Sequence, residues 1–185
     1  MTGGWGSGAR FRFCPHCGGP LDRAARARCA ACGYTQYRNP IAAVAAILLA
    51  RGDELPKAGE VVPPGAATHL LLVRRTASFA GMWCIPCGYV EYEEDIRVAA
   101  VRELREETGL AAEIGDVYAV QSNFHEPLNQ TVGTWFLVRY VSGSLRAADD
   151  ADRAAFFPLA APPEPLAFPT DRRVITALRA GRAHA

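Results

Sequence analysis

The sequence predicts an α/β fold with a small cysteine-rich segment in front of it. Two short apolar runs, residues 41–49 and 69–73, are rich in Val, Ile, Leu and Ala and are typical of buried strands. Residues 95–109 carry apolar side chains at helical spacing between a capping aspartate and a glycine. Four cysteines in two CxxC pairs precede all of these elements. The apolar runs and the helical segment indicate one α/β core, and the cysteine pairs indicate a separate N-terminal appendage.

The composition of the 185 residues narrows the function classes. Half of the residues are hydrophobic and 21% are charged, enough for one full core and a small appendage. The formal net charge of +1 gives no electrostatic reason to expect nucleic acid or an anionic membrane as the partner. Residues 1–8 lack the apolar centre of an export signal, and no stretch reaches the roughly 18 apolar residues of a membrane span. We therefore expect a cytoplasmic protein.

The N-terminal cysteines have the spacing of a structural zinc site. Each pair is followed by a glycine, Gly18 or Gly33, as a tight metal-binding turn requires. Four thiolates so placed close a tetrahedral Zn²⁺ site, and so short a segment has too little apolar surface to fold without the metal. His16 lies inside the first turn and is interpreted as a bystander. We predict a flexible N-terminus at 1–12 and a zinc ribbon at 13–38, with zinc bound by Cys14, Cys17, Cys29 and Cys32.

A third CxxC pair, Cys84 and Cys87, is interpreted differently. No partner pair lies near it in the sequence, and Pro86 stands between its thiols in a strand-like segment. Nothing nearby suggests a lowered thiol pKa. Buried small side chains are therefore favoured over a redox-active pair or a second zinc site.

The connections and the C-terminal elements follow from turn residues and apolar patterns. Residues 51–68 are rich in Pro and Gly and predict a long, disordered connection. Residues 117–122 and 134–141 are expected to be strands, and 147–155 a charged connection before the aromatic segment 156–159. Thr170 is expected to cap a last helix that ends at Leu178 and has Val174, Ile175 and Leu178 on its apolar side.

The helix predicted at 95–109 is unusual in its acidic face. Its apolar positions are Ile96, Ala99, Ala100 and Leu104, whereas Glu103, Glu106 and Glu107 lie on adjacent turns. Three like charges so placed repel one another and need compensation. One interpretation is a solvated acidic face moderated by Arg102 and Arg105. The other is a site for hard divalent cations, whose preferred ligands are carboxylate oxygens.

The stretch 88–110 decides between these interpretations because it resembles the Nudix box of the Nudix hydrolase family. The box is a glycine, five residues, Glu, seven residues, and then Arg-Glu-apolar-x-Glu-Glu-x-Gly-apolar. Every fixed position is met, by Gly88, Glu94, Arg102, Glu103, Leu104, Glu106, Glu107, Gly109 and Leu110. The resemblance implies a Nudix domain at 40–180, an α/β/α sandwich with a mixed sheet between the box helix and the last helix.

The resemblance also implies the chemistry. Glu103, Glu106 and Glu107 would bind Mg²⁺ or Mn²⁺ together with the Gly88 carbonyl, and Arg102 and Glu94 would brace the carboxylates. The catalytic residues would then be Arg102, Glu103, Glu106 and Glu107, acting in water attack on a diphosphate that joins a nucleoside to another group. Which carboxylate is the base stays open.

The substrate follows only in part from the resemblance. ADP-ribose, FAD or a related adenine dinucleotide is the leading class. An NAD(H) pyrophosphatase or NAD-cap RNA decapping enzyme is the alternative, although residues 121–127 lack the Gln-Pro-Trp type of signature usual in those enzymes. A third alternative is a binding module whose catalysis has lapsed and whose ribbon docks a partner or nucleic acid; the intact box argues against it.

The candidate substrate-binding residues are Arg74, Arg75, Phe124, His125 and Glu126. By resemblance, arginines after the strand at 69–73 lie near the phosphates. The polar loop 123–130 is either an ordinary surface turn or a substrate-lining loop, and both interpretations stay open. The expected partner is a small nucleotide-diphosphate substrate. A homodimer is also expected, because related enzymes commonly assemble as dimers.

Overall fold

The computed structural model describes residues 11–22, 26–37, 39–126 and 129–184. The chain forms two compact units, residues 1–40 and 41–185, which are described separately below. Of the N-terminus predicted to be flexible, residues 1–10 lie outside the described residues, as does residue 38 at the end of the predicted ribbon.

The N-terminal unit is a two-stranded antiparallel sheet with two tight turns. Strands β1 (Arg26–Arg28) and β2 (Thr35–Tyr37) pair with each other, and its core consists of Cys14, Leu21, Ala27 and Cys29. The turn glycines Gly18 and Gly33 have φ of 73° and 75°, a region that favours glycine. Their N–H groups donate to the carbonyls of Cys14 and Cys29, both at 2.9 Å. The two turns are therefore built alike.

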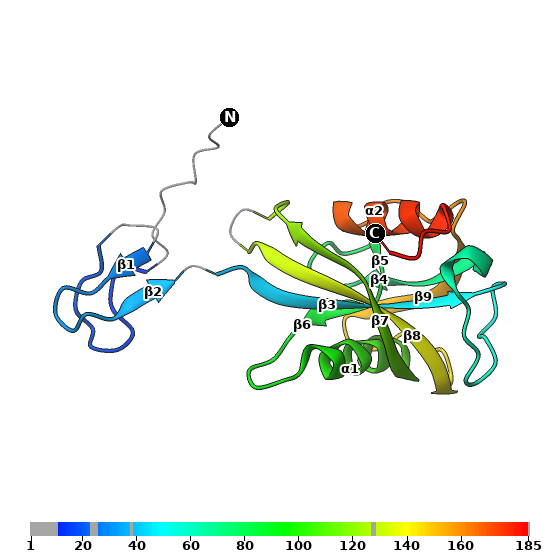
Figure 1. The fold of residues 1–185 in the computed structure, drawn as a ribbon, viewed down its shortest axis with the longest axis horizontal. Helices are drawn as coiled ribbons and strands as arrows, with labels where there is room; N and C mark the ends of the chain where they lie inside the picture. Colours follow the sequence, from blue (N-terminus) through cyan, green and yellow to red (C-terminus); the bar gives the residue numbers. More distant parts are fainter. Residues whose placement is uncertain (1–10, 23–25, 38, 127–128, 185) are drawn as a thin grey trace. The chain divides into compact units, whose positions relative to one another are not determined.

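The second unit is a mixed seven-stranded sheet with one helix on each face (Figure 1). Its strand order is β5-β4-β3-β8-β7, with β6 paired to β3 and β9 to β4. The β3–β8 pair is parallel and the other pairs are antiparallel, so the predicted mixed α/β/α sandwich is confirmed. The strands are β3 (Ile41–Ala50), β4 (His69–Arg75), β5 (Trp83–Cys84), β6 (Cys87–Tyr89), β7 (Leu110–Asn123), β8 (Thr131–Gly143) and β9 (Ala151–Pro158).

The two central strands supply apolar side chains to both faces of the sheet. In β3, Ile47 joins the core under helix α2 (Pro169–Arg179), whereas Leu48 joins the core that contains Leu104 of helix α1 (Ile96–Thr108). In β4, Leu70 and Leu72 join the core under α2, and Leu71 joins the core that contains Leu104. Because successive side chains of a strand point to opposite faces, a continuous apolar run is what a doubly covered strand needs.

Helix α1 has the predicted limits. The Asp95 side chain caps it by accepting from the Arg97 N–H at 2.8 Å, and Gly109 ends it with φ of 70°. Ala99, Ala100 and Leu104 are fully buried, but Ile96 in the first turn remains 37% exposed. The apolar stripe is therefore shorter than expected.

Three local predictions are wrong. Thr170 is not the cap of α2: the helix begins at Pro169 after Phe168, so Thr170 lies in its first turn. The segment 51–68 is not a disordered connection, since Gly59 N–H donates to the Tyr140 carbonyl at 2.9 Å and residues Pro64–Ala66 form a 3₁₀ helix, η1. The charged connection predicted at 147–155 ends before Ala151, because β9 begins at that residue and pairs along β4.

Candidate active site

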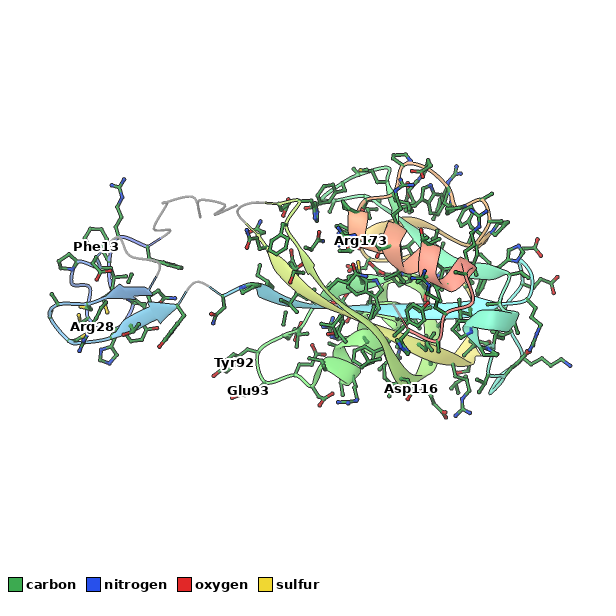
Figure 2. The ribbon with its side chains drawn as sticks, turned by 45° about the horizontal axis from the view of Figure 1, so that its top comes forward. Phe13, Arg28, Tyr92, Glu93, Asp116 and Arg173 are labelled. Atoms are coloured by element: carbon green, nitrogen blue, oxygen red, sulfur yellow. The ribbon has the colours of Figure 1, made fainter. Side chains whose placement is uncertain are left out.

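A cavity of about 440 Å³ opens in the second unit. Its lining comes from β3, β6, α1 and β8, from the last residues of β4 and β7, from the β4–β5, β7–β8 and β8–β9 connections, and from the start of α2. The loop between β6 and α1 contributes Glu91 to the lining, whereas Tyr92 and Glu93 at its tip point into solvent (Figure 2). The predicted metal-binding glycine, Gly88, and one box carboxylate, Glu103, both line the cavity.

Arg102 compensates the acidic face of α1. Its Nη1 donates to Glu103 at 2.8 Å and to Glu106 at 2.9 Å. Its Nε and Nη2 donate to the two oxygens of Glu94, both at 2.8 Å, and Nη2 also donates to the Tyr89 carbonyl at 3.1 Å. One guanidinium thus fixes two box carboxylates of the helix relative to the loop that precedes it.

Glu107 is the box glutamate whose negative charge is least balanced by a neighbouring positive group. Its side chain is 1% exposed, and its Oε2 accepts from the Cys87 N–H at 3.0 Å. Burial raises the pKa of Glu107 to about 10, helped by the nearby Cys87 and Asp150. Burial also raises the pKa of Glu103, although Arg102 acts in the opposite direction. Both shifts indicate that burial disfavours the ionised form of these two carboxylates, an effect that a bound cation would oppose.

Gly88 lies directly against the Glu103 carboxylate. A Cβ added at Gly88 would stand 2.1 Å from the Glu103 carboxyl carbon, far inside any possible contact. Glycine is therefore required here by close approach of the Glu103 carboxylate to the backbone. The Gly88 backbone and the Glu103 carboxylate therefore lie close together, and the Cys87 N–H holds Glu107 next to this turn of the chain.

Asp150 is a cavity residue that sequence reasoning missed. It lies just before β9, lines the cavity beside Glu103, and accepts from Arg75 Nη2 at 3.0 Å. Its charge contributes to the raised pKa of Glu103 and of Glu107. The only signal in the sequence was the acidic stretch 149–152. It lies about 40 residues after the box, so no sequence motif connects the two.

The predicted substrate residues divide into two groups. Arg75, His125 and Glu126 line the cavity. Arg74 is not part of the lining and pairs with Asp152 at 2.6 Å, and Phe124 is 62% exposed outside the lining. The loop after β7 thus contributes to the cavity, but not through its aromatic residue.

Cys84 is buried near Arg75, and Cys87 lines the cavity. The Arg75 Nη1 is 3.7 Å from the Cys84 sulfur and 3.9 Å from the Cys87 sulfur. The neighbouring Cys84 thiol and burial raise the pKa of Cys87 well above its ordinary value. A raised pKa disfavours the thiolate and so fits the predicted packing role better than a redox role.

The four N-terminal cysteines form a group that could hold a metal ion. Their sulfurs all lie within 4.8 Å of one another, with Cys14 and Cys32 3.7 Å apart and Cys17 and Cys29 3.5 Å apart. Within the described ranges, this is the only cluster of metal-binding side chains of that compactness, and it does not include Cys84 or Cys87.

Comparison with known proteins places the fold and the site in context. The family model described as NUDIX domain matches residues 57–178. The ADP-ribose pyrophosphatase of Methanocaldococcus jannaschii is 36% identical over 91 residues, which are 49% of this chain and 54% of that protein. The NAD-capped RNA hydrolase NudC of Pseudomonas aeruginosa is 30% identical over 180 residues, 94% of this chain and 58% of that protein. The chain spans a little over half the length of these two relatives.

The solved structures agree on the architecture. A NUDIX hydrolase from Nitrosomonas europaea matches with a TM-score of 0.71 at 24% identity, over 94% of this chain and 96% of that one. At this identity the match shows the shared fold. None of the helices in the described part of the chain is long and apolar enough to cross a membrane.

Proposed function

The chain belongs to the Nudix family, and we propose that it hydrolyses a diphosphate bond joining a nucleoside to a second group, with Mg²⁺ or Mn²⁺ as the catalytic cation. The observation that carries this proposal is the close approach of the Glu103 carboxylate to the Gly88 backbone, next to the buried Glu107 carboxylate that accepts from the Cys87 N–H. Both carboxylates have a raised pKa. A cation bound beside a buried carboxylate stabilises its ionised form.

The residues present fit a hard divalent cation. Carboxylate oxygens of Glu103, Glu106 and Glu107 and the carbonyl of Gly88 would hold it, and all of these donors are oxygen atoms, which Mg²⁺ and Mn²⁺ prefer. When bound, such a cation neutralises phosphate charge and lowers the pKa of a water molecule. Asp150, in the connection just before β9, adds a carboxylate to this cavity and is our candidate for an additional ligand or for the base.

The protein's own residues would position the reacting groups. Arg102 orients Glu103 and Glu106 through its hydrogen bonds. Because its guanidinium also donates to Glu94, it is not expected to bind the substrate. Arg75 lines the cavity and carries the charge that a phosphate needs. His125 and Glu126 lie on the same cavity from the β7–β8 loop. Arg74 and Phe124, which lie outside the lining, are expected to matter less.

The leading substrate class is ADP-ribose, FAD or a related adenine dinucleotide. It is supported by the 36% identity to a protein named ADP-ribose pyrophosphatase. A second candidate, hydrolysis of NAD(H) or of NAD-capped RNA, is supported by the relative named NAD-capped RNA hydrolase, which matches 94% of the chain. A binding module without catalysis is disfavoured because all three box glutamates are present and oriented.

Turnover of a substrate panel tests the proposal. Purified protein with Mg²⁺ or with Mn²⁺ is given ADP-ribose, FAD, NADH and an NAD-capped RNA, and the phosphate products are separated by chromatography. We expect ADP-ribose or FAD to give the highest kcat/KM. A clear preference for the capped RNA would select the second candidate, and no cleavage of any member would contradict both.

Zinc in the N-terminal unit is part of the same proposal. Four sulfurs bound to one tetrahedral zinc at about 2.3 Å would stand roughly 3.8 Å apart. Two of the sulfur separations, 3.5 and 3.7 Å, are close to that arrangement. Zinc held by Cys14, Cys17, Cys29 and Cys32 would have no open coordination position and would act structurally.

We also propose that the protein is a cytoplasmic homodimer and that its N-terminal unit serves assembly before catalysis. Phe13, Tyr34 and Tyr37 are all exposed on that unit, which is more aromatic surface than a small unit needs for its own core. A second copy of the chain would cover it.

A further inference from the structure

Asp171 is a buried carboxylate to which the proposed function gives no role. It lies in the first turn of α2, lines the cavity and is 1% exposed. Its Oδ1 accepts from Nε1 of Trp135 at 3.1 Å, and its Oδ2 accepts from the Ile85 N–H at 3.0 Å. Both donors are neutral groups. Because burying a carboxylate between neutral donors is costly, Asp171 is a candidate for a functional role.

The two donors that meet at Asp171 can be satisfied together only by a carboxylate. An indole N–H and a backbone N–H can only donate, and a carboxylate offers one acceptor oxygen to each. An asparagine has the same shape but one oxygen and one NH₂ group, so it would set a donor against either Trp135 or Ile85. The indole cannot easily turn away, because its ring lies directly over Gly133, where an added Cβ would stand 2.8 Å from it.

The Ile85 N–H belongs to a short stretch of backbone that is held by a different element at each residue. Helix α2 holds Ile85 through the aspartate described above. The Pro86 carbonyl accepts from the Ala46 N–H of β3 at 2.9 Å, and the Cys87 N–H donates to Glu107 of α1 at 3.0 Å. Three consecutive residues are therefore fixed by three elements, and the last of them contacts a box carboxylate.

This stretch leads directly to the proposed cation site. Gly88 is its next residue and lies against the Glu103 carboxylate, with no room for a side chain between them. Helices α2 and α1 cover opposite faces of the sheet (Figure 1). Asp171 thus contacts one end of a stretch whose other end contacts carboxylates of α1. Because Pro86 restricts the backbone between the two ends, a shift at Ile85 is transmitted to Gly88.

We propose that Asp171 is a positioning residue for the catalytic cation. By accepting from Ile85 and Trp135 together, its carboxylate holds residues 85–88 in the arrangement in which the Gly88 backbone and Glu107 bind a divalent cation. Asp171 acts through the backbone and is not itself a ligand. The inference rests on the proposed function, since it concerns the same cation site, and it extends that site to residues outside the box.

Binding of Mn²⁺ to the full chain, measured from the electron paramagnetic resonance signal of free Mn²⁺, tests the proposal without turnover. The titration is made at pH 8 because burial raises the pKa of Asp171 to about 7 and its carboxylate must be ionised. Asp171→Asn is expected to weaken Mn²⁺ binding about tenfold, because one buried donor loses its acceptor and the stretch is held less firmly. Unchanged affinity overturns the proposal.

A second substitution distinguishes positioning from a general loss of packing. Trp135→Phe removes the indole donor, so the asparagine of Asp171→Asn can turn its oxygen to the Ile85 N–H and keep that hydrogen bond. The double variant should therefore bind Mn²⁺ within about threefold of Trp135→Phe alone. Independent losses of packing would add instead and leave the double variant as the weakest binder, a result that overturns the proposal.

Matched controls make the same changes elsewhere. Asp116→Asn alters an exposed aspartate of β7 outside the cavity and should bind Mn²⁺ like wild type. Trp83→Phe removes an indole that packs on Phe157 and should not rescue Asp171→Asn. Urea unfolding shows which variants are folded. If Asp171→Asn does not fold, its combination with Trp135→Phe decides: it should fold and bind Mn²⁺, and failure to do so overturns the proposal.

Glu107→Gln separates failure of this inference from failure of the proposed function. It removes the charge of a proposed ligand and should abolish specific Mn²⁺ binding. If wild type binds no Mn²⁺, or binds it no more tightly than Glu107→Gln, the proposed cation site is wrong and the inference fails with it. If Glu107→Gln loses binding and Asp171→Asn retains it in full, the cation site stands and the inference alone is wrong.

Discussion

Arg102 and Glu94 form a bidentate ion pair in which Nε and Nη2 of the arginine donate to the two carboxylate oxygens, both at 2.8 Å. The side chain of Glu94 is 12% exposed, so solvent screens the pair only partly. Glu94 also accepts from the Glu91 N–H at 3.0 Å. The pair ties the loop before α1 to the helix face that carries the box carboxylates.

Replacing Glu94 by Gln tests this pair through its pH dependence. The Arg102 hydrogen bonds lower the pKa of Glu94 from 4.5 to about 2. Because the folded-state pKa is depressed, the pair stabilises the fold above pH 4.5 and loses this effect as pH falls towards 2. We expect Glu94→Gln to lower the free energy of unfolding by about 1–2 kcal/mol at pH 7, and by much less at pH 3.

Urea unfolding at pH 7, 5 and 3 measures this difference. Glu93→Gln is the matched control, since Glu93 points into solvent at the tip of the same loop (Figure 2). An equal loss of stability at all three pH values would show that the charge of Glu94 is not what matters.

Asp150→Asn tests the carboxylate that the β8–β9 connection adds to the cavity. The change keeps the shape but removes a charge beside Glu103, so turnover is expected to fall by about tenfold or more and to need a higher Mg²⁺ concentration. Steady-state kinetics over a Mg²⁺ series gives both quantities. Asp152→Asn is the control because Asp152 pairs with Arg74 outside the lining. Equal activity of the two variants would remove Asp150 from the site.

Elemental analysis tests the assignment of the cysteines. We expect one zinc per chain, lost in Cys14→Ser and retained in the double variant Cys84→Ser, Cys87→Ser. Two zinc ions per chain, or loss of zinc in the double variant, would mean that the third pair binds metal.

Deletion of residues 1–38 tests the role of the N-terminal unit. The shortened chain is expected to become monomeric, because the exposed aromatic residues Phe13, Tyr34 and Tyr37 are removed with the unit. Light scattering gives the mass and the substrate panel gives the turnover. If the shortened chain stays dimeric and cleaves small dinucleotides fully but loses an RNA substrate, the unit recognises nucleic acid instead.

The features of the fold that could be predicted from the sequence are those that depend on local interactions. Helix α1 ends where Asp95 and Gly109 predict, because a cap acts on the adjacent turn. The buried strands were evident because the apolar runs of β3 and β4 are covered on both faces. The box residues meet at one place because most of them share one helix.

Contacts between residues far apart in the sequence determined the features that the sequence did not predict. β7 extends from Leu110 although its first half contains Glu113, Gly115 and Asp116, because it pairs with β8 along this length through several irregular registers. Gly59 is fixed by a hydrogen bond to the distant Tyr140. Asp150 and Thr170 reach the cavity only because β9 and α2 are placed beside it by the sheet.

Turnover of ADP-ribose by wild type and by Glu107→Gln, each with EDTA and with Mg²⁺, tests the central claim most directly. Glutamine resembles the protonated form that burial favours for Glu107, so the variant should fold as stably as wild type. It cannot supply the charge that a cation needs. We predict that wild type is active with Mg²⁺ and inactive with EDTA, and that Glu107→Gln loses about 100-fold or more in kcat. Undiminished turnover in the variant, or in EDTA, would contradict the account.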